Sequence, residues 1–185
     1  MDIAVYVLGC LMASGLLTWI SRKPLRIPGS HGFYRFFAWQ GILMLFALHH
    51  PYFETTYLMA QPVLAFLFFC CSVILVAAGW WGLVRVGRPS AERNDKALFS
   101  FEKTTVLVDS GIFGIIRHPM YASLLLLAWG AFFQRPTPFG IPVLLLTSLF
   151  LALTARADEN ECLAYFGAVY ADYKKRTWAL IPWLY

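Results

Sequence analysis

Two short polar clusters in the second half of the chain combine residue types that bind charged small molecules. The first is Arg117-His118-Pro119-Met120-Tyr121, which precedes an apolar run, and the second is Arg156-Ala157-Asp158-Glu159-Asn160-Glu161, which follows another. Carboxylates bind ammonium groups, and Arg or His bind carboxylates, through charge-assisted hydrogen bonds. Alone, the first cluster also fits an anchor at a membrane surface, and the second fits solvated carboxylates at a membrane boundary. Brought together they predict a polar pocket, because ionisable groups near membrane depth tend to be functional.

The composition indicates that helices in a bilayer position these clusters. Hydrophobic residues make up 59% of the 185 residues and charged residues only 14%, whereas soluble domains are about 45–50% apolar. A soluble domain of this size could not cover so much apolar surface with polar groups. We therefore expect one domain that is all-α and embedded in a membrane.

Apolar runs predict about five transmembrane helices, since each crossing needs about 20 residues. The runs are 3–20, 36–48, 57–86, 121–133 and 139–154. A tight turn at 134–138 makes the last two a helical hairpin, which returns both polar clusters to the same membrane face. After them, 157–175 is predicted as a polar amphipathic helix, since Leu163, Phe166, Tyr170 and Tyr173 repeat at helical spacing.

The basic residues predict the orientation of these helices. With five spans, all but one of the 15 Lys and Arg residues fall on one side of the membrane, and the exception is Arg135. The positive-inside rule then places the N-terminus outside, and the C-terminus and both clusters in the cytoplasm. The same residues flank apolar runs and form no single patch, so nucleic-acid binding is not expected.

Motifs around both clusters resemble a known family. Leu107-Val108-Asp109-Ser110-Gly111, followed by Arg117-His118-Pro119-Met120-Tyr121, is similar to the signature of the isoprenylcysteine carboxyl methyltransferase family, which includes phospholipid and small-thiol methyltransferases. A second set of residues resembles the C-terminal signature of this family: Glu159, Phe166-Gly167, Tyr170, Tyr173, Arg176 and Ile181-Pro182. The likeness covers residues 80–185, which would form the cofactor-binding half. Residues 1–79 resemble the family only as hydrophobic N-terminal helices.

The resemblance implies S-adenosylmethionine as cofactor, bound in a cytoplasm-facing pocket. The positions that match its contacts are Thr105, Val106, Leu107, Val108, Phe113, His118, Pro119, Met120, Tyr121 and a carboxylate at Glu159 or Asp158. Catalytic roles fall on Arg117, His118, Glu159 and Arg156, the last facing the acceptor. Phe113 stands where the family usually has Tyr, so one hydroxyl is missing. The acceptor would be a lipophilic or small apolar carboxylate, thiol or amine that enters from the membrane lipid.

Three other interpretations were weighed. Membrane sterol reductases, which use NADPH, share a related C-terminal half, but they have more spans and usually Asn at the position of Met120. A non-enzymatic membrane scaffold would need no ordered polar pocket. No metal is expected, because His49-His50 and Cys70-Cys71 are adjacent pairs whose side chains point in different directions on a helix.

Overall fold

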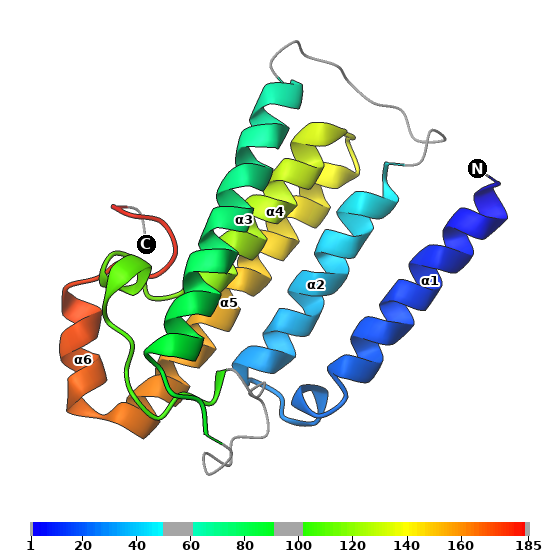
Figure 1. Ribbon diagram of the computed structural model, residues 1–185. Coiled ribbons are helices and arrows are strands. Elements are labelled where there is room, and N and C mark those ends of the chain that lie inside the picture. Colours follow the sequence, from blue (N-terminus) through cyan, green and yellow to red (C-terminus); the bar gives the residue numbers. More distant parts are fainter. Residues whose placement is uncertain (1, 50–60, 91–101, 184–185) are drawn as a thin grey trace.

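The computed structural model describes residues 2–49, 61–90 and 102–183, and these residues are almost entirely helical (Figure 1). Within them the structure has no strand, only isolated bridges. The long helices and their bounds are α1 (Ile3–Ile20), α2 (His31–Ala47), α3 (Gln61–Arg85), α4 (Pro119–Gln134), α5 (Gly140–Phe166) and α6 (Ala168–Lys175), with short 3-10 turns η1 (Pro24–Arg26) and η3 (Gly111–Gly114). The all-α prediction is confirmed.

Helices α1 to α5 run alternately up and down, and α6 lies beside the lower end of the bundle in Figure 1. Helix α3 packs mainly on α4, and α2 packs mainly on α5. Helix α1 contacts α2 and contains no buried residue. Because directions alternate, the turn after α1, the end of α3, the start of α4 and the end of α5 share one end of the molecule.

Three helices, α1, α3 and α5, are long and apolar enough to cross a membrane, and α4 is a shorter apolar helix. Large apolar side chains such as Leu11, Phe66 and Leu145 are more than half exposed on their outer surfaces. A surface of this kind is stable in lipid and not in water, so the chain is a membrane protein. The structure supports three of the expected spans by length and hydropathy. Residues 57–60 of the expected third span lie outside the described residues.

Helix α5 differs from the expectation, since it does not end near Thr154. It continues to Phe166, so its polar last turns and its apolar part form one helix. Buried partners, His118 for Asp158 and Arg117 for Glu159, offset these charges, so the helix can carry them without ending at the apolar boundary. The break comes at Gly167, whose φ of 62° and ψ of −134° are accessible essentially only to glycine. Helix α6 starts there as a separate, amphipathic helix.

The contact of α2 with α5 depends on the absence of a side chain at Gly41. A Cβ built there would lie 2.1 Å from Thr147 Oγ1 and 3.2 Å from Thr147 Cβ. Thr147 is buried and hydrogen-bonded to the Val143 carbonyl of its own helix, so it has little room to move. The two helices therefore approach closely at this point.

Gly41→Ala is expected to lower the free energy of unfolding by about 1–3 kcal/mol, the usual cost of overpacking a buried contact. Thermal unfolding of the detergent-purified protein measures this. The double variant Gly41→Ala/Thr147→Ala removes the clashing hydroxyl and should recover most of the loss. Equal stability of Gly41→Ala and the parent protein would show that α2 and α5 are not closely packed there.

Candidate functional site

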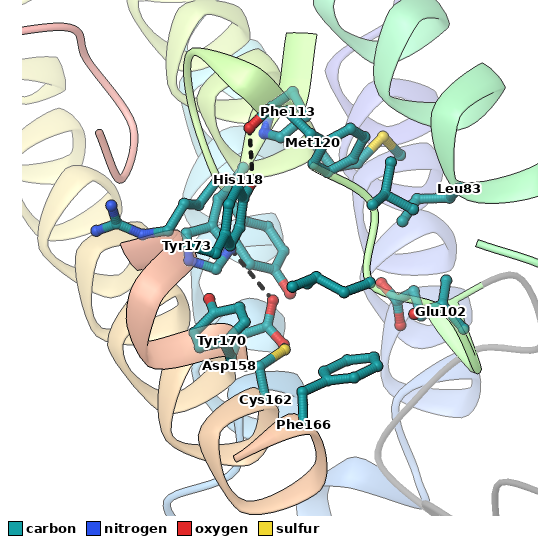
Figure 2. A pocket seen from close by; sticks show the side chains of 16 residues that line it. Leu83, Glu102, Phe113, His118, Met120, Asp158, Cys162, Phe166, Tyr170 and Tyr173 are labelled. Carbon is teal, nitrogen blue, oxygen red and sulfur yellow. Dashed lines mark hydrogen bonds and ion pairs between the residues drawn. The ribbon is translucent and has the colours of Figure 1, made fainter. Parts of the chain in front are cut away.

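A cavity lies at the lower end of the bundle, where α3, α4 and α5 meet η3, the preceding loop and α6 (Figure 2). Its empty space is about 700 Å³, including the part open to solvent. Residues from both polar clusters line it, as the hairpin of α4 and α5 predicts. Of the residues expected in the site, nine line this cavity: Leu107, Val108, Phe113, Arg117, His118, Pro119, Met120, Tyr121 and Asp158.

Four expected site residues lie elsewhere. Thr105 and Val106 are exposed, and the buried neighbour Thr104 lines the cavity in their place. Arg156 and Glu159 line an adjoining polar recess with Asn160, Lys174 and Arg117. Arg117 therefore lies between the two spaces.

The first cluster is fixed by the C-terminal segment, through backbone pairing. The Arg117 N–H donates to the Trp178 carbonyl at 2.7 Å, and the His118 N–H donates to the Ala179 carbonyl at 3.1 Å. In return, the Trp178 N–H donates to the Ile115 carbonyl at 3.0 Å. Pro119 then begins α4, where its missing N–H costs nothing. This pairing orients the side chains of residues 117 and 118 toward α5.

His118 and Asp158 form the polar centre of the cavity. His118 Nδ1 lies 3.3 Å from Asp158 Oδ2, and the His118 ring stacks on Tyr121 at 5.4 Å between centroids. The Tyr121 hydroxyl hydrogen-bonds the same carboxylate. Burial lowers the pKa of His118, but the carboxylates of Asp158 and Glu159 outweigh it, so that the pKa is raised. His118 Nε2 is buried and makes no hydrogen bond in the described part of the chain, but it lies 3.6 Å from Glu159 Oε1.

Glu159 forms ion pairs with two cationic side chains of the protein. Arg117 donates to its Oε1 from Nε at 2.9 Å and from Nη2 at 2.7 Å, and Lys174 Nζ lies 2.5 Å from Oε2. Arg117 also donates to the carbonyls of Lys174 and Thr177. Glu159 therefore joins α5 to α6 and to the segment before α4. Its carboxylate has little capacity left for a ligand.

Aromatic rings make up much of the remaining cavity wall. Phe113 of η3 and Phe166, Tyr170 and Tyr173 of the α5–α6 region all line it. The Tyr173 hydroxyl donates to the Phe113 carbonyl at 2.7 Å, which fixes η3 against α6. The helical spacing of Phe166, Tyr170 and Tyr173 predicts only that they share one face of a helix, without a place in the site. The family signature contains Phe166, Tyr170 and Tyr173, so the signal was present.

The cavity also contains residues that sequence reasoning missed, namely Leu83, Glu102, Thr104 and Cys162. Leu83 follows the apolar pattern of α3 and carries no polar signal. Cys162 lies one turn after Asp158, with its Sγ 3.7 Å from Oδ1. Glu102 lies in a mixed polar segment, and its partners, Arg35 and His31, belong to α2. No local pattern connects residues so far apart in sequence.

One group in the described residues has the donor atoms that a metal needs. His31, Asp158 and Glu161 offer a nitrogen and carboxylate oxygens that lie within 4.8 Å of one another. However, His31 Nδ1 already lies 2.6 Å from Glu161 Oε2, and Asp158 is paired with His118. The charges are therefore balanced by protein groups. His49 of the adjacent histidine pair contacts the Ala131 carbonyl, and His50 lies outside the described residues.

Comparison with known proteins identifies similar sequences. A family model described as phospholipid methyltransferase matches residues 60–172, which include α3, α4, α5, most of α6 and every residue that lines the cavity except Tyr173. Methanethiol S-methyltransferase 2 of Bradyrhizobium diazoefficiens is 28% identical over 74 residues, which are 40% of this chain and 28% of that protein. The compared segment thus spans less than a third of the length of this relative.

Proposed function

Because the chain belongs to the phospholipid methyltransferase family and is a membrane methyltransferase, we propose that it transfers a methyl group from S-adenosylmethionine to a lipophilic or small apolar acceptor. The reaction takes place in the cavity at the lower end of the bundle, on the cytoplasmic face of the membrane, with the N-terminus of the chain outside. The observation that carries this proposal is the convergence of Asp158, His118 and Tyr121 on one aromatic-walled cavity.

The polar centre fits the amino-acid part of this cofactor. Asp158 offers a carboxylate at the cavity wall for the ammonium group. His118 has a raised pKa, and its Nε2 makes no hydrogen bond among the described residues, with Glu159 Oε1 at 3.6 Å, so that a small shift of the ring would let it donate to the cofactor's carboxylate. Arg117 and Glu159 satisfy each other and are better suited to hold these two residues in place.

The wall of the cavity fits the rest of the cofactor. When bound, S-adenosylmethionine supplies an electrophilic methyl group on a positively charged sulfur. The faces of Phe113, Tyr121 and Phe166 can stabilise a cation by cation–π attraction. The same side chains exclude water, so that an acceptor atom loses its hydration before reaction. Since methyl transfer is an in-line displacement, such positioning and desolvation supply much of the rate.

We propose that the acceptor enters the cavity from lipid along α3. Leu83 of α3 and Met120 of α4 form an apolar part of the wall. Gly79 allows α3 and α4 to lie close together here, because a Cβ at this position would lie 3.0 Å from Met120 Sδ. Trp81 is exposed and lies against the Arg85 guanidinium at 4.2 Å, which is typical of an anchor at the membrane interface.

Because the related methanethiol S-methyltransferase is named for a thiol acceptor, a thiol belongs with the amine and carboxylate among the candidates.

Calorimetric titration of the detergent-purified protein tests the cofactor. We expect binding of S-adenosylmethionine and S-adenosylhomocysteine, weakened by His118→Ala, and no binding of NADPH in a parallel titration. The exposed residue Asn160 provides a matched control, because it lies on the same helix as Asp158 and lines only the adjoining recess. Asn160→Ala should bind like the parent protein. Binding of NADPH alone would reject the proposal in favour of a reductase.

A further inference from the structure

A second carboxylate lines the cavity at a distance from Asp158. Glu102 belongs to the segment that leads into η3, and its side chain is 13% exposed. Figure 2 shows it on the side of the cavity near Leu83, whereas Asp158 lies with His118 and Tyr170 on the other side. The polar centre proposed for the cofactor therefore leaves Glu102 without a role.

Helix α2 holds Glu102 in place. Arg35 Nη1 forms an ion pair with Oε1 of Glu102, and His31 Nε2 lies 3.9 Å from Oε2. Both α2 side chains are almost inaccessible, at 3% exposure for Arg35 and 0% for His31. A third contact fixes His31, because its backbone N–H and its Nδ1 both face Glu161 of α5. Two buried side chains thus hold the Glu102 carboxylate in one position.

This arrangement lies partly outside the region that the family shares. Glu102 falls within the matched residues 60–172, whereas His31 and Arg35 precede them. The N-terminal helices of this chain therefore contribute to the cavity by orienting one of its charged groups. A residue so placed can distinguish between acceptors.

The hydrogen-bonding capacity at this position discriminates among the three acceptor classes. A carboxylate acceptor would meet two further carboxylates, Glu102 and Asp158, and neither of them offers it a hydrogen-bond donor. An ammonium acceptor would pair with Glu102 and be held in its protonated form, whose nitrogen has no free electron pair. A neutral thiol fits both the apolar wall and the carboxylate, to which its S–H can donate.

We propose, on the basis of the function above, that the acceptor is a thiol and that Glu102 is the base that removes its proton. A lone pair of the thiol sulfur forms the new bond to the methyl carbon. The old carbon–sulfur bond breaks and leaves its electron pair on the sulfur of the departing thioether. As the new bond forms, the S–H becomes strongly acidic, so the proton passes to the Glu102 carboxylate and then to water. Arg35 and His31 act as positioning residues.

The experiment uses the full-length protein in detergent with methyl-labelled S-adenosylmethionine and three probes of equal chain length: 1-decanethiol, 1-decylamine and decanoic acid. We expect methylation of the thiol at a rate at least about 100-fold above the other two. Glu102→Gln should lower kcat for the thiol by about 100-fold or more, the usual effect of losing a general base. Affinity for S-adenosylhomocysteine should be unchanged, and Glu102→Asp should recover part of the rate.

The pH profile separates this role from a structural one. As the pH approaches the pKa of the thiol itself, a growing fraction of the thiol ionises in solution and needs no base, so the Glu102→Gln rate should rise with pH toward that of the parent protein. His31→Gln should converge in the same way. Among the described residues, the charged and titratable groups that interact with Glu102 or with the side chain of His31 beside it are His31 and Arg35 of α2, Tyr121 of α4, and Asp158 and Glu161 of α5. Asp172→Asn, which removes an exposed carboxylate from α6, is the charge-matched control and should follow the parent profile.

The outcomes are distinct for the two proposals. If cofactor binds and decanoic acid or decylamine is methylated as well as the thiol, or if Glu102→Gln keeps the parent rate and pH profile, the role of Glu102 is rejected and the methyltransferase stands. If neither S-adenosylmethionine nor S-adenosylhomocysteine binds the parent protein, the cofactor assignment itself fails.

Discussion

Asp158→Asn should weaken the binding of S-adenosylhomocysteine by about 10- to 150-fold, which corresponds to the loss of a charge-assisted hydrogen bond of about 1.5–3 kcal/mol. The side chain keeps its size and its place beside His118, but the cofactor's ammonium group loses an anionic partner. S-adenosylhomocysteine is the right probe because it carries the same amino-acid group and no sulfonium. Calorimetric titration at neutral pH measures the change directly.

The comparison with Asp158→Glu and Asn160→Asp sharpens this test. Asp158→Glu retains the charge one methylene further into the cavity and should bind more tightly than Asp158→Asn. Asn160→Asp adds a charge on the exposed side of the same helix and should leave affinity nearly unchanged. Unchanged affinity in Asp158→Asn would remove this carboxylate from the proposed binding site.

Glu159→Gln is expected to act on folding rather than on cofactor affinity. The carboxylate is 4% exposed and pairs with Arg117, whose side chain is 8% exposed. Removing one partner of a buried ion pair leaves the other charge uncompensated and typically costs about 3–5 kcal/mol. Thermal unfolding in detergent should therefore show a large decrease in Tm. The Lys174 contact adds little to this figure, since that side chain is 42% exposed and screened by solvent.

Lys174→Met serves as the partner variant, because it removes the exposed cation and leaves the Arg117 pair intact. Its Tm should stay close to that of the parent protein. The opposite pattern for Glu159→Gln, normal stability together with lost binding of S-adenosylhomocysteine, would show that Glu159 holds the cofactor. The sequence pattern allowed that role for either carboxylate, so these two variants decide between neighbouring residues.

The structure explains why some of these features could be predicted from sequence. A short turn between two apolar runs predicts a hairpin, and a hairpin brings its two ends together, so the meeting of His118 with Asp158 follows from local patterns. The helical repeat of Tyr170 and Tyr173 likewise predicts one buried face, and both side chains are buried.

Other features depend on contacts between residues that are distant in sequence. Thr105 and Val106 match the family's contact positions, but the chain turns there so that Thr104 faces inward. The sequence pattern predicts the end of α5 near Thr154, too early, because charged residues normally mark the end of an apolar helix. Here Lys174 and Arg117, which come from other elements, neutralise Glu159. The role of α2 in holding Glu102 was missed for the same reason.

The pairing of residues 115–118 with 178–179 has a consequence for biosynthesis. The helices that enter the membrane first do not contain a complete site, because the backbone partners of Arg117 and His118 are synthesised more than fifty residues later. A chain that ends near residue 170 contains all of α1 to α5 but cannot fix either side chain. Cofactor binding is thus expected to begin only after translation has passed Ala179, when the bundle is already in the bilayer.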